Sequence, residues 1–94
     1  MIDFLAFIYD VEDINDLDWD DEEKVVDLNW PARSGFQAKA EADGLKLAWS
    51  HPDRIASREL AGYWPVYEFD RFNQIRRKLV LSDGSVLVGK RQHA

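Results

Sequence analysis

Carboxylates near the start of the chain are the residues whose types and spacing could do chemistry. Asp16, Asp18 and Asp20 alternate as in the opening of a calcium-binding loop, where carboxylate oxygens ligate a hard cation. Such a loop needs Gly at its sixth position and Glu at its twelfth, whereas this chain has Asp21 and Asp27 there. The spacing therefore predicts a solvated acidic segment and no metal site.

Ser50, His51 and Asp53 are the three residue types of a hydrolase triad, in which a histidine accepts the proton of a serine nucleophile. Residues this close within one turn do not meet in that geometry, and Ser50 before Pro52 fits the cap and first turn of a short helix. Glu68 has the most apolar neighbours of any acid, but in a strand those neighbours point to the opposite face. We therefore predict no catalytic residue, no enzymatic activity and no cofactor.

Charge is divided unevenly along the chain. Residues 1–30 contain eleven acids and one base, and residues 31–94 contain seven acids and eleven bases. The formal net charge of −6 therefore conceals an acidic N-terminal third and a basic C-terminal hairpin. An acidic folded surface can fill a groove that evolved for a nucleic acid and can attract a basic partner. The same acids can instead dock on the protein's own basic end or keep the chain soluble, and the sequence leaves these alternatives open.

We predict a small acidic, non-enzymatic binding protein that inhibits or masks a basic, nucleic-acid-binding protein partner. Inhibitors, immunity proteins and phage anti-defence proteins have this general character, and some mimic a nucleic acid. Trp19 lies between two aspartates, where it is difficult to bury, and tryptophan is enriched at interface hot spots, so we interpret it as an anchor. The predicted partner-binding residues are Asp16, Asp18, Trp19, Asp20, Asp21, Glu22 and Glu23.

The alternative hypothesis is a nucleic-acid-binding module in residues 63–78, which mix aromatic and basic side chains. Single-stranded nucleic acids are held by aromatic platforms with cationic rims. A half-exposed strand with cationic edge protection has the same composition, and no specific nucleic-acid-binding motif accompanies it. The residues of this alternative site are Tyr67, Arg71, Phe72, Arg76, Arg77 and Lys78.

The first third of the chain predicts one strand and one helix. Residues 2–9 alternate as a strand with two apolar faces, although a helix with heptad-like spacing stays possible there. Asp20 is the expected N-cap of a helix, with Glu23 completing a capping box. Pro31 is expected to end this helix.

The middle of the chain predicts a hairpin and a short helix. Residues 36–49 alternate about Asp43-Gly44, a pair that suits the positive φ angles of a two-residue hairpin turn. A short helix then begins near Pro52 and ends about Ala61, closed by Gly62.

The last third predicts an aromatic strand and a second hairpin. Residues 63–69 form the strand, with Pro65 placing it at a sheet edge or bulge and Trp64 in the core. Residues 75–81 and 86–89 flank the turn Asp83-Gly84.

Ninety-four residues are too few for two independent cores. We predict a single α+β domain over residues 1–94, with a mostly antiparallel sheet of about four to five strands, two Asp-Gly hairpins and two short helices on one face. The chain has no cysteine, which excludes disulfides and thiolate metal sites, and no apolar run approaches the roughly 20 residues that span a membrane. We expect a cytoplasmic location and no membrane contact, while the oligomeric state stays open.

Overall fold

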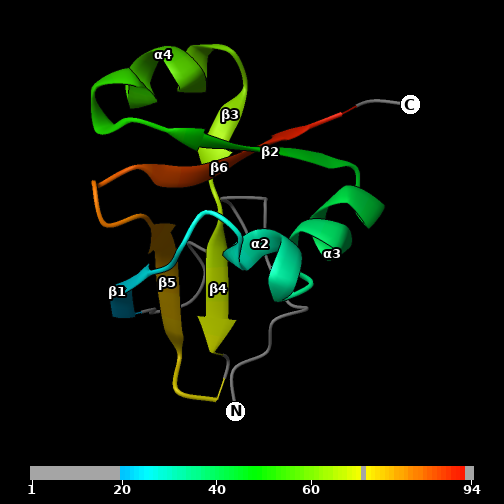
Figure 1. The fold of residues 1–94 in the computed structure, drawn as a ribbon, viewed down its shortest axis with the longest axis vertical. Coiled ribbons are helices and arrows are strands. Elements are labelled where there is room, and N and C mark those ends of the chain that lie inside the picture. Colours follow the sequence, from blue (N-terminus) through cyan, green and yellow to red (C-terminus); the bar gives the residue numbers. More distant parts are fainter. Residues whose placement is uncertain (1–19, 71, 93–94) are drawn as a thin grey trace.

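The described part of the molecule is an α+β fold with a mixed six-stranded sheet and short helices (Figure 1). The computed structural model describes residues 20–70 and 72–92. In chain order its elements are β1 (Asp20–Val25), α2 (Trp30–Arg33), α3 (Phe36–Ala42), β2 (Leu45–Ser50), the 3-10 turn η1 (Pro52–Arg54), α4 (Ile55–Leu60), β3 (Tyr63–Pro65), β4 (Tyr67–Asp70), β5 (Ile75–Val80) and β6 (Val86–Arg91).

The sheet has two arms that meet where β5 and β6 join. One arm places β5 between β1 and β4, and the other places β6 between β2 and β3. Only Val80 and Val86 pair directly between β5 and β6, and Figure 1 shows β2 and β6 running across the direction of β4 and β5. The segment from β3 to β4 links the arms, since β3 pairs with β6 and β4 with β5. Between them, the N–H of Val66 donates to the carbonyl of Leu87 at 3.1 Å.

The helix predicted to start at Asp20 is wrong, because this segment is the strand β1, paired in parallel with β5. Its capping pattern was a local signal, whereas the observed conformation is stabilised by cross-strand contacts with residues more than fifty positions away. Pro31 does not end a helix but lies in the first turn of α2, where its missing N–H costs nothing.

The first strand of the hairpin predicted over residues 36–49 is also wrong, because this part is the helix α3. Its alanines occur at every second position, but the buried residues Phe36 and Ala40 are four apart, which is the helical period. Gly44 follows the helix with φ of 84°, so its conformational freedom ends a helix and does not close a hairpin. The return strand was predicted correctly and is β2.

Other predictions are confirmed. The short helix is present as η1 and α4, followed by Gly62 with φ of 94°. The aromatic strand is present as β3 and β4, interrupted just after Pro65. The second hairpin is closed at Asp83-Gly84, where the N–H of Leu81 donates to the carbonyl of Ser85 at 2.8 Å. The α+β class is confirmed, with a mixed sheet of six strands; the strand predicted at 2–9 lies outside the described residues.

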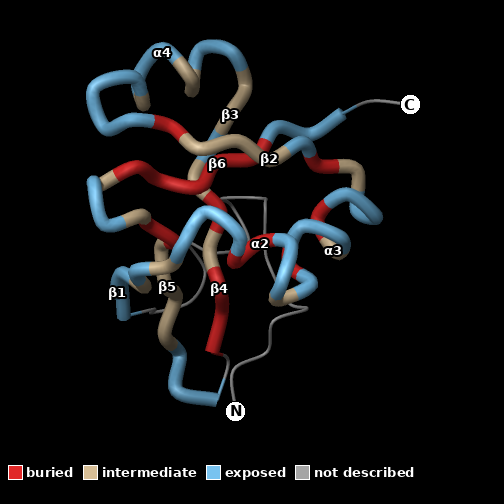
Figure 2. The backbone as a smooth tube through the Cα atoms, viewed as in Figure 1, coloured by how far each residue is buried: buried red, intermediate tan, exposed pale blue. Residues whose placement is uncertain are grey.

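Two clusters of buried side chains lie within the described fold, and Figure 2 shows buried residues along β4, β6 and the end of β5. The larger cluster packs α2 and α3 on the sheet, with Trp30 and Phe36 ring centroids 5.4 Å apart. Its buried members are Trp30, Phe36, Ala40, Leu45, Val66, Phe69, Leu79 and Leu87. The smaller cluster joins Val80, Val86 and Val88, with Ile55 of α4 packed against it. Within residues 20–70 and 72–92, no helix has the length and apolar character needed to cross a membrane.

Gly89 on β6 lies where Leu45 of β2 and Val66 of the linking segment pack closely against the backbone. A Cβ atom there would lie 2.8 Å from Cδ2 of Leu45 and 3.0 Å from Cγ1 of Val66, closer than side chains pack. Glycine therefore allows Leu45 and Val66 to close over the centre of the sheet.

Gly89→Ala should lower the free energy of unfolding by about 1–3 kcal/mol, the range for overpacking a tight core. Urea unfolding of the single variant and of Gly89→Ala in a Leu45→Val background measures this. The shorter valine removes the Cδ2 contact, so the glycine substitution should cost less in the second background. An equal cost in both backgrounds would contradict this packing account.

Candidate functional site

Charged side chains of β1 and β5 lie in register along their parallel pairing. Asp21 is opposite Arg76, Glu22 opposite Arg77, and Glu23 opposite Lys78. Residues opposite one another in a sheet share a face, so each carboxylate faces a cation.

Two of these three pairs are ion pairs. Arg76 donates through Nε and Nη2 to the two carboxylate oxygens of Asp21, with Nη2 to Oδ2 at 3.1 Å. Arg77 Nε lies 3.2 Å from Oε1 of Glu22. Of the alternatives that the sequence left open for the acidic N-terminal third, docking on the protein's own basic end therefore occurs at Asp21 and Glu22.

The acids in these pairs face outward and the bases are covered. The side chains of Asp21 and Glu22 are 62% and 48% exposed, against 22% and 19% for Arg76 and Arg77. Asp20 and Glu23 are exposed and form no ion pair within the described part of the chain. Carboxylates are thus exposed on both faces of β1.

Hydrogen bonding in the Asp21–Arg76 pair shifts both titrations. The bonds from Arg76 hold the pKa of Asp21 below its ordinary value, and the same contact raises the pKa of Arg76. The Cζ atom of Arg76 also lies 5.1 Å from the ring centre of Tyr67, whose pKa is raised by burial. Arg76 is therefore held by both a carboxylate and an aromatic ring.

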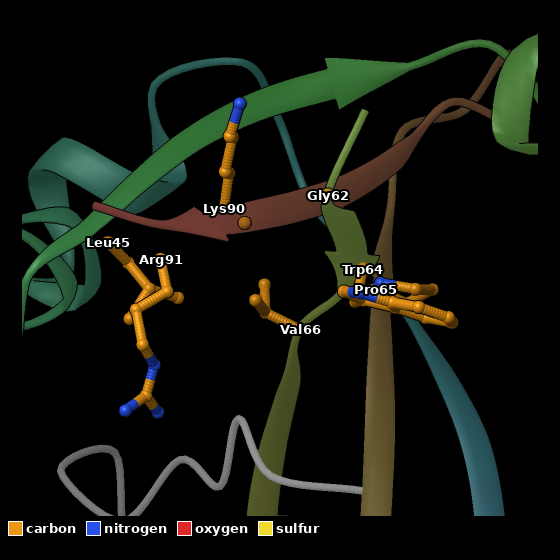
Figure 3. Close-up of a pocket in the computed structure, with 8 residues that line it drawn as sticks. Leu45, Gly62, Trp64, Pro65, Val66, Lys90 and Arg91 are labelled. Atoms are coloured by element: carbon orange, nitrogen blue, oxygen red, sulfur yellow. The ribbon is translucent and has the colours of Figure 1, made fainter. Parts of the chain in front are cut away.

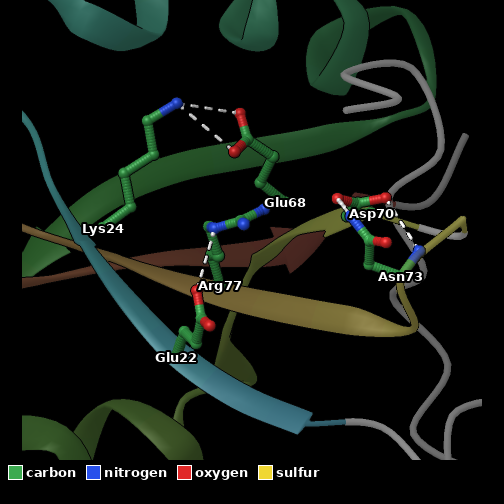
Figure 4. A network of polar contacts seen from close by, with 6 residues as sticks. All are labelled: Glu22, Lys24, Glu68, Asp70, Asn73 and Arg77. Atoms are coloured by element: carbon green, nitrogen blue, oxygen red, sulfur yellow. Dashed lines mark hydrogen bonds and ion pairs between the residues drawn. The ribbon is translucent and has the colours of Figure 1, made fainter. Parts of the chain in front are cut away.

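The face of these strands that carries Glu22 and Arg77, opposite the face of Asp21 and Arg76, also carries a buried charge network (Figure 4). Glu68 of β4 has no exposed surface, and Lys24 Nζ lies 3.3 and 3.2 Å from its two carboxylate oxygens. Lys24 Nζ also lies 4.9 Å from the ring centre of Trp30. Arg77 is opposite Glu68 across β4 and β5, and its Nη1 is buried without a hydrogen-bond partner in the described structure.

Sequence reasoning recognised that the neighbours of Glu68 point to the other face, but it missed that this carboxylate is buried. The cations beside it come from β1 and β5, and only the strand pairing shows that they meet there. This network stabilises the join between β1, β4 and β5.

Asp70 and Asn73 form the turn between β4 and β5. The backbone N–H and side-chain amide of Asn73 donate to the Asp70 carboxylate at 3.1 and 2.9 Å, which lowers the pKa of Asp70. Phe72, a residue of the alternative nucleic-acid site, is exposed in this turn. Asp70 therefore serves to close the turn.

Ser50, His51 and Asp53 do not form a triad. Ser50 is buried and its hydroxyl donates to the carbonyl of His51 at 3.3 Å. His51 Nδ1 accepts from the N–H of Asp53 at 3.3 Å, so His51, and not Ser50 as predicted, caps η1. Across residues 20–70 and 72–92, no three His, Asp or Glu side chains gather as a metal site.

The predicted site residues separate into distinct places. Asp16, Asp18, Trp19 and Arg71 lie outside the described residues. Lys78 and Tyr67 line a shallow hollow of about 250 Å³. The other residues that line it are the acids Asp21, Glu22 and Glu23, so a ligand that reached Lys78 of β5 there would also meet carboxylates.

A second, larger hollow of about 370 Å³ was missed by the sequence analysis. Figure 3 shows Arg91 and Leu45 on one side of it, Trp64 and Pro65 on the other, and Val66 between them. Trp64 is 49% exposed, so its predicted place in the core is wrong: it lies on β3, which pairs only with β6 among the described strands.

Comparisons with protein-family models, curated proteins and solved structures returned no match to this chain.

Lys24→Met should lower the free energy of unfolding by about 2–3 kcal/mol, below the roughly 3–5 kcal/mol of a fully buried pair, because the Lys24 side chain is 29% exposed. The cost arises because the Glu68 carboxylate would stay buried without this ammonium group. Urea unfolding checks it against Lys46→Met, an exposed lysine in the same type of element, for which we expect a change within about 0.5 kcal/mol. Equal effects of the two substitutions would show that the Lys24–Glu68 pair contributes no stability.

The Asp21–Arg76 pair should make the free energy of unfolding depend on pH in the acid range. A lowered pKa contributes stability that is present above the unfolded-state value, 3.8, and is lost as the pH falls through the folded-state value. The stability difference between wild type and Asp21→Asn should thus be small but measurable near neutral pH, since the carboxylate is largely exposed, and should shrink below about pH 4. Urea titrations across this range test it, and in an Arg76→Gln background the difference should lose most of its pH dependence. A difference that does not change with pH would contradict the role given to this pair.

Proposed function

We propose that this chain is a non-enzymatic binding protein whose acidic surface contacts a basic, nucleic-acid-binding protein and inhibits or masks it. The observation that carries the proposal is the arrangement of β1, where carboxylates face outward over covered arginines. No part of the proposal requires a cofactor or a metal ion.

Charge arithmetic supports an acidic binding surface. Residues 20–94 contain twelve acids and twelve bases, so the whole net charge of −6 is carried by residues 1–19. These residues contain no base, and their acids are Asp3, Asp10, Glu12, Asp13, Asp16 and Asp18. The uncompensated charge therefore directly precedes β1 in the chain, and a cluster of one sign raises the association rate with an oppositely charged partner.

The ion pairs on β1 support the proposal through preorganisation. Arg76 and Arg77 hold the carboxylates of Asp21 and Glu22 in place while leaving about half of each side chain exposed. A partner cation would then meet carboxylates that lose little freedom on binding. Alternate residues of a strand lie about 6.6–6.8 Å apart, and this replaces the helical spacing expected from the sequence.

Asp20 and Glu23 supply carboxylates that are not already engaged in an ion pair within the described residues. Because they form no ion pair within the described residues, a basic partner can contact them without separating an existing pair. With Asp16, Asp18 and the anchor Trp19, they complete the proposed interface. A chain without cysteine suits a reducing compartment, and we place the encounter in the cytoplasm.

The decisive variant neutralises Asp16, Asp18, Asp20 and Glu23 by substitution with Asn or Gln, which spares the ion pairs of Asp21 and Glu22. Its matched control neutralises four acids elsewhere, Glu41, Asp43, Asp53 and Glu59, and so changes the net charge equally. In nuclease-treated pull-downs from host lysate, wild type and control should retain a basic partner that the decisive variant loses at least about tenfold, because the lost attraction lowers the association rate.

Association rates measured with the purified partner complete this test. The wild-type rate should fall steeply with ionic strength and the rate of the decisive variant should not. Equal recovery of the partner by the decisive variant and wild type, or equal losses in variant and control, would reject the proposed interface.

A further inference from the structure

Three cations meet on one face of the second arm of the sheet. Lys46 of β2 and Tyr63 of β3 are both opposite Lys90 of β6, so the three residues form a row across adjacent strands. Arg58 of α4 completes the group, since its Cζ lies 5.7 Å from the ring centre of Tyr63, while Lys90 Nζ lies 5.8 Å from it. Lys46 and Tyr63 are far from Lys90 in the sequence, and the strand pairing brings these three residues together.

Unlike the arginines of β5, these cations lack carboxylate partners. Within the described part of the chain, Lys46, Arg58 and Lys90 form no ion pair. Lys46 and Lys90 are exposed like charges directly opposite each other, an arrangement that destabilises a sheet unless an anion lies between them. The surface is therefore one that a bound anion would stabilise.

A half-exposed tryptophan lies across β3 from this group. Trp64 follows Tyr63 in β3 and borders the hollow of about 370 Å³, which Lys90 also lines. Figure 3 shows the Lys90 side chain extending to the opposite side of β6 from Arg91 and the hollow's centre. Because successive residues of a strand point to opposite faces, Trp64 lies on the other face of β3 from Tyr63 and Lys90.

We propose that Lys46, Arg58, Tyr63, Trp64 and Lys90, the Tyr63 cluster, form a binding site for single-stranded nucleic acid. The three cations would contact successive phosphates on one face of this arm, and the bound strand would then cross the edge at β3, which pairs only with β6 among the described strands, so that an unpaired base stacks on the exposed face of Trp64. A duplex hides its base faces and would leave Trp64 without a partner. The inference is independent of the proposed protein partner, because the Tyr63 cluster shares no residue with β1.

Fluorescence anisotropy with a labelled oligothymidylate of about 12 nucleotides, on the full-length protein, tests this site. Wild type should bind at about 50 mM salt, with a slope of log association constant against log salt of about −2, since each single-strand phosphate contact contributes about −0.7. The variant Lys46→Gln/Lys90→Gln should weaken binding and reduce the slope to about −0.7. Arg33→Gln/Lys39→Gln is the matched control, which removes two cations from α2 and α3, and it should bind like wild type.

Trp64 distinguishes a nucleic-acid site from a general anion-binding surface. Trp64→Ala should weaken single-strand binding roughly tenfold or more, and Trp64→Phe should largely restore it, because phenylalanine keeps a face for stacking. Circular dichroism of each variant confirms folding, and Lys46→Gln alone serves if the double variant does not fold. The proposal would be overturned if wild type did not bind the oligonucleotide, or if the lysine variant bound it as tightly as wild type. It would also be overturned if Trp64→Ala had the same affinity as wild type for both the single strand and a duplex.

Discussion

The parallel pairing of β1 with β5 is the interaction on which the first arm of the sheet depends. It places four acids beside a strand with three consecutive bases, so like charges that would repel within each strand are compensated across the pair. The two arginine–carboxylate contacts are charge-assisted, and one of them uses both carboxylate oxygens. The strand β1, which pairs only with β5 among the described strands and has Val25 as its one apolar side chain, is thereby held in place.

The same pairing makes a buried carboxylate tolerable. Glu68 of β4 is fully buried. An isolated charge there would destabilise the fold by roughly several kcal/mol, even after the surrounding protein had relaxed around it. Lys24 from β1 supplies the opposite charge at hydrogen-bond distance, with its ammonium group over Trp30. Burial of Glu68 and docking of β1 are therefore mutually dependent, which links the acidic strand to the packing of α2 on the sheet.

The two arms of the sheet differ in whether their cations have carboxylate partners. On the first arm the arginines of β5 are covered by acids, which leaves carboxylates outermost and supports the proposed contact with a basic partner. On the second arm Arg58 and Lys90 lie near the ring of Tyr63, Lys46 is opposite Lys90, and none of the three forms an ion pair within the described residues. The described residues of this acidic chain thus include an acidic strand and a group of cations, and each proposal uses a different one of the two.

The sequence by itself determined the features that depend on neighbouring residues: the α+β class, the turn at Asp83-Gly84, the short helix before Gly62 and the interruption at Pro65. Local patterns misled where distant partners decide the conformation, since the capping pattern at Asp20 is overridden by β5 and the alternating alanines of α3 pack as a helix. Only the tertiary structure decided that Asp21 covers Arg76, that Glu68 is buried, and that Lys46 meets Lys90. Each of these arrangements depends on residues more than forty positions apart in the sequence. The register of the paired strands decides which of these residues meet, and composition and local spacing do not determine that register.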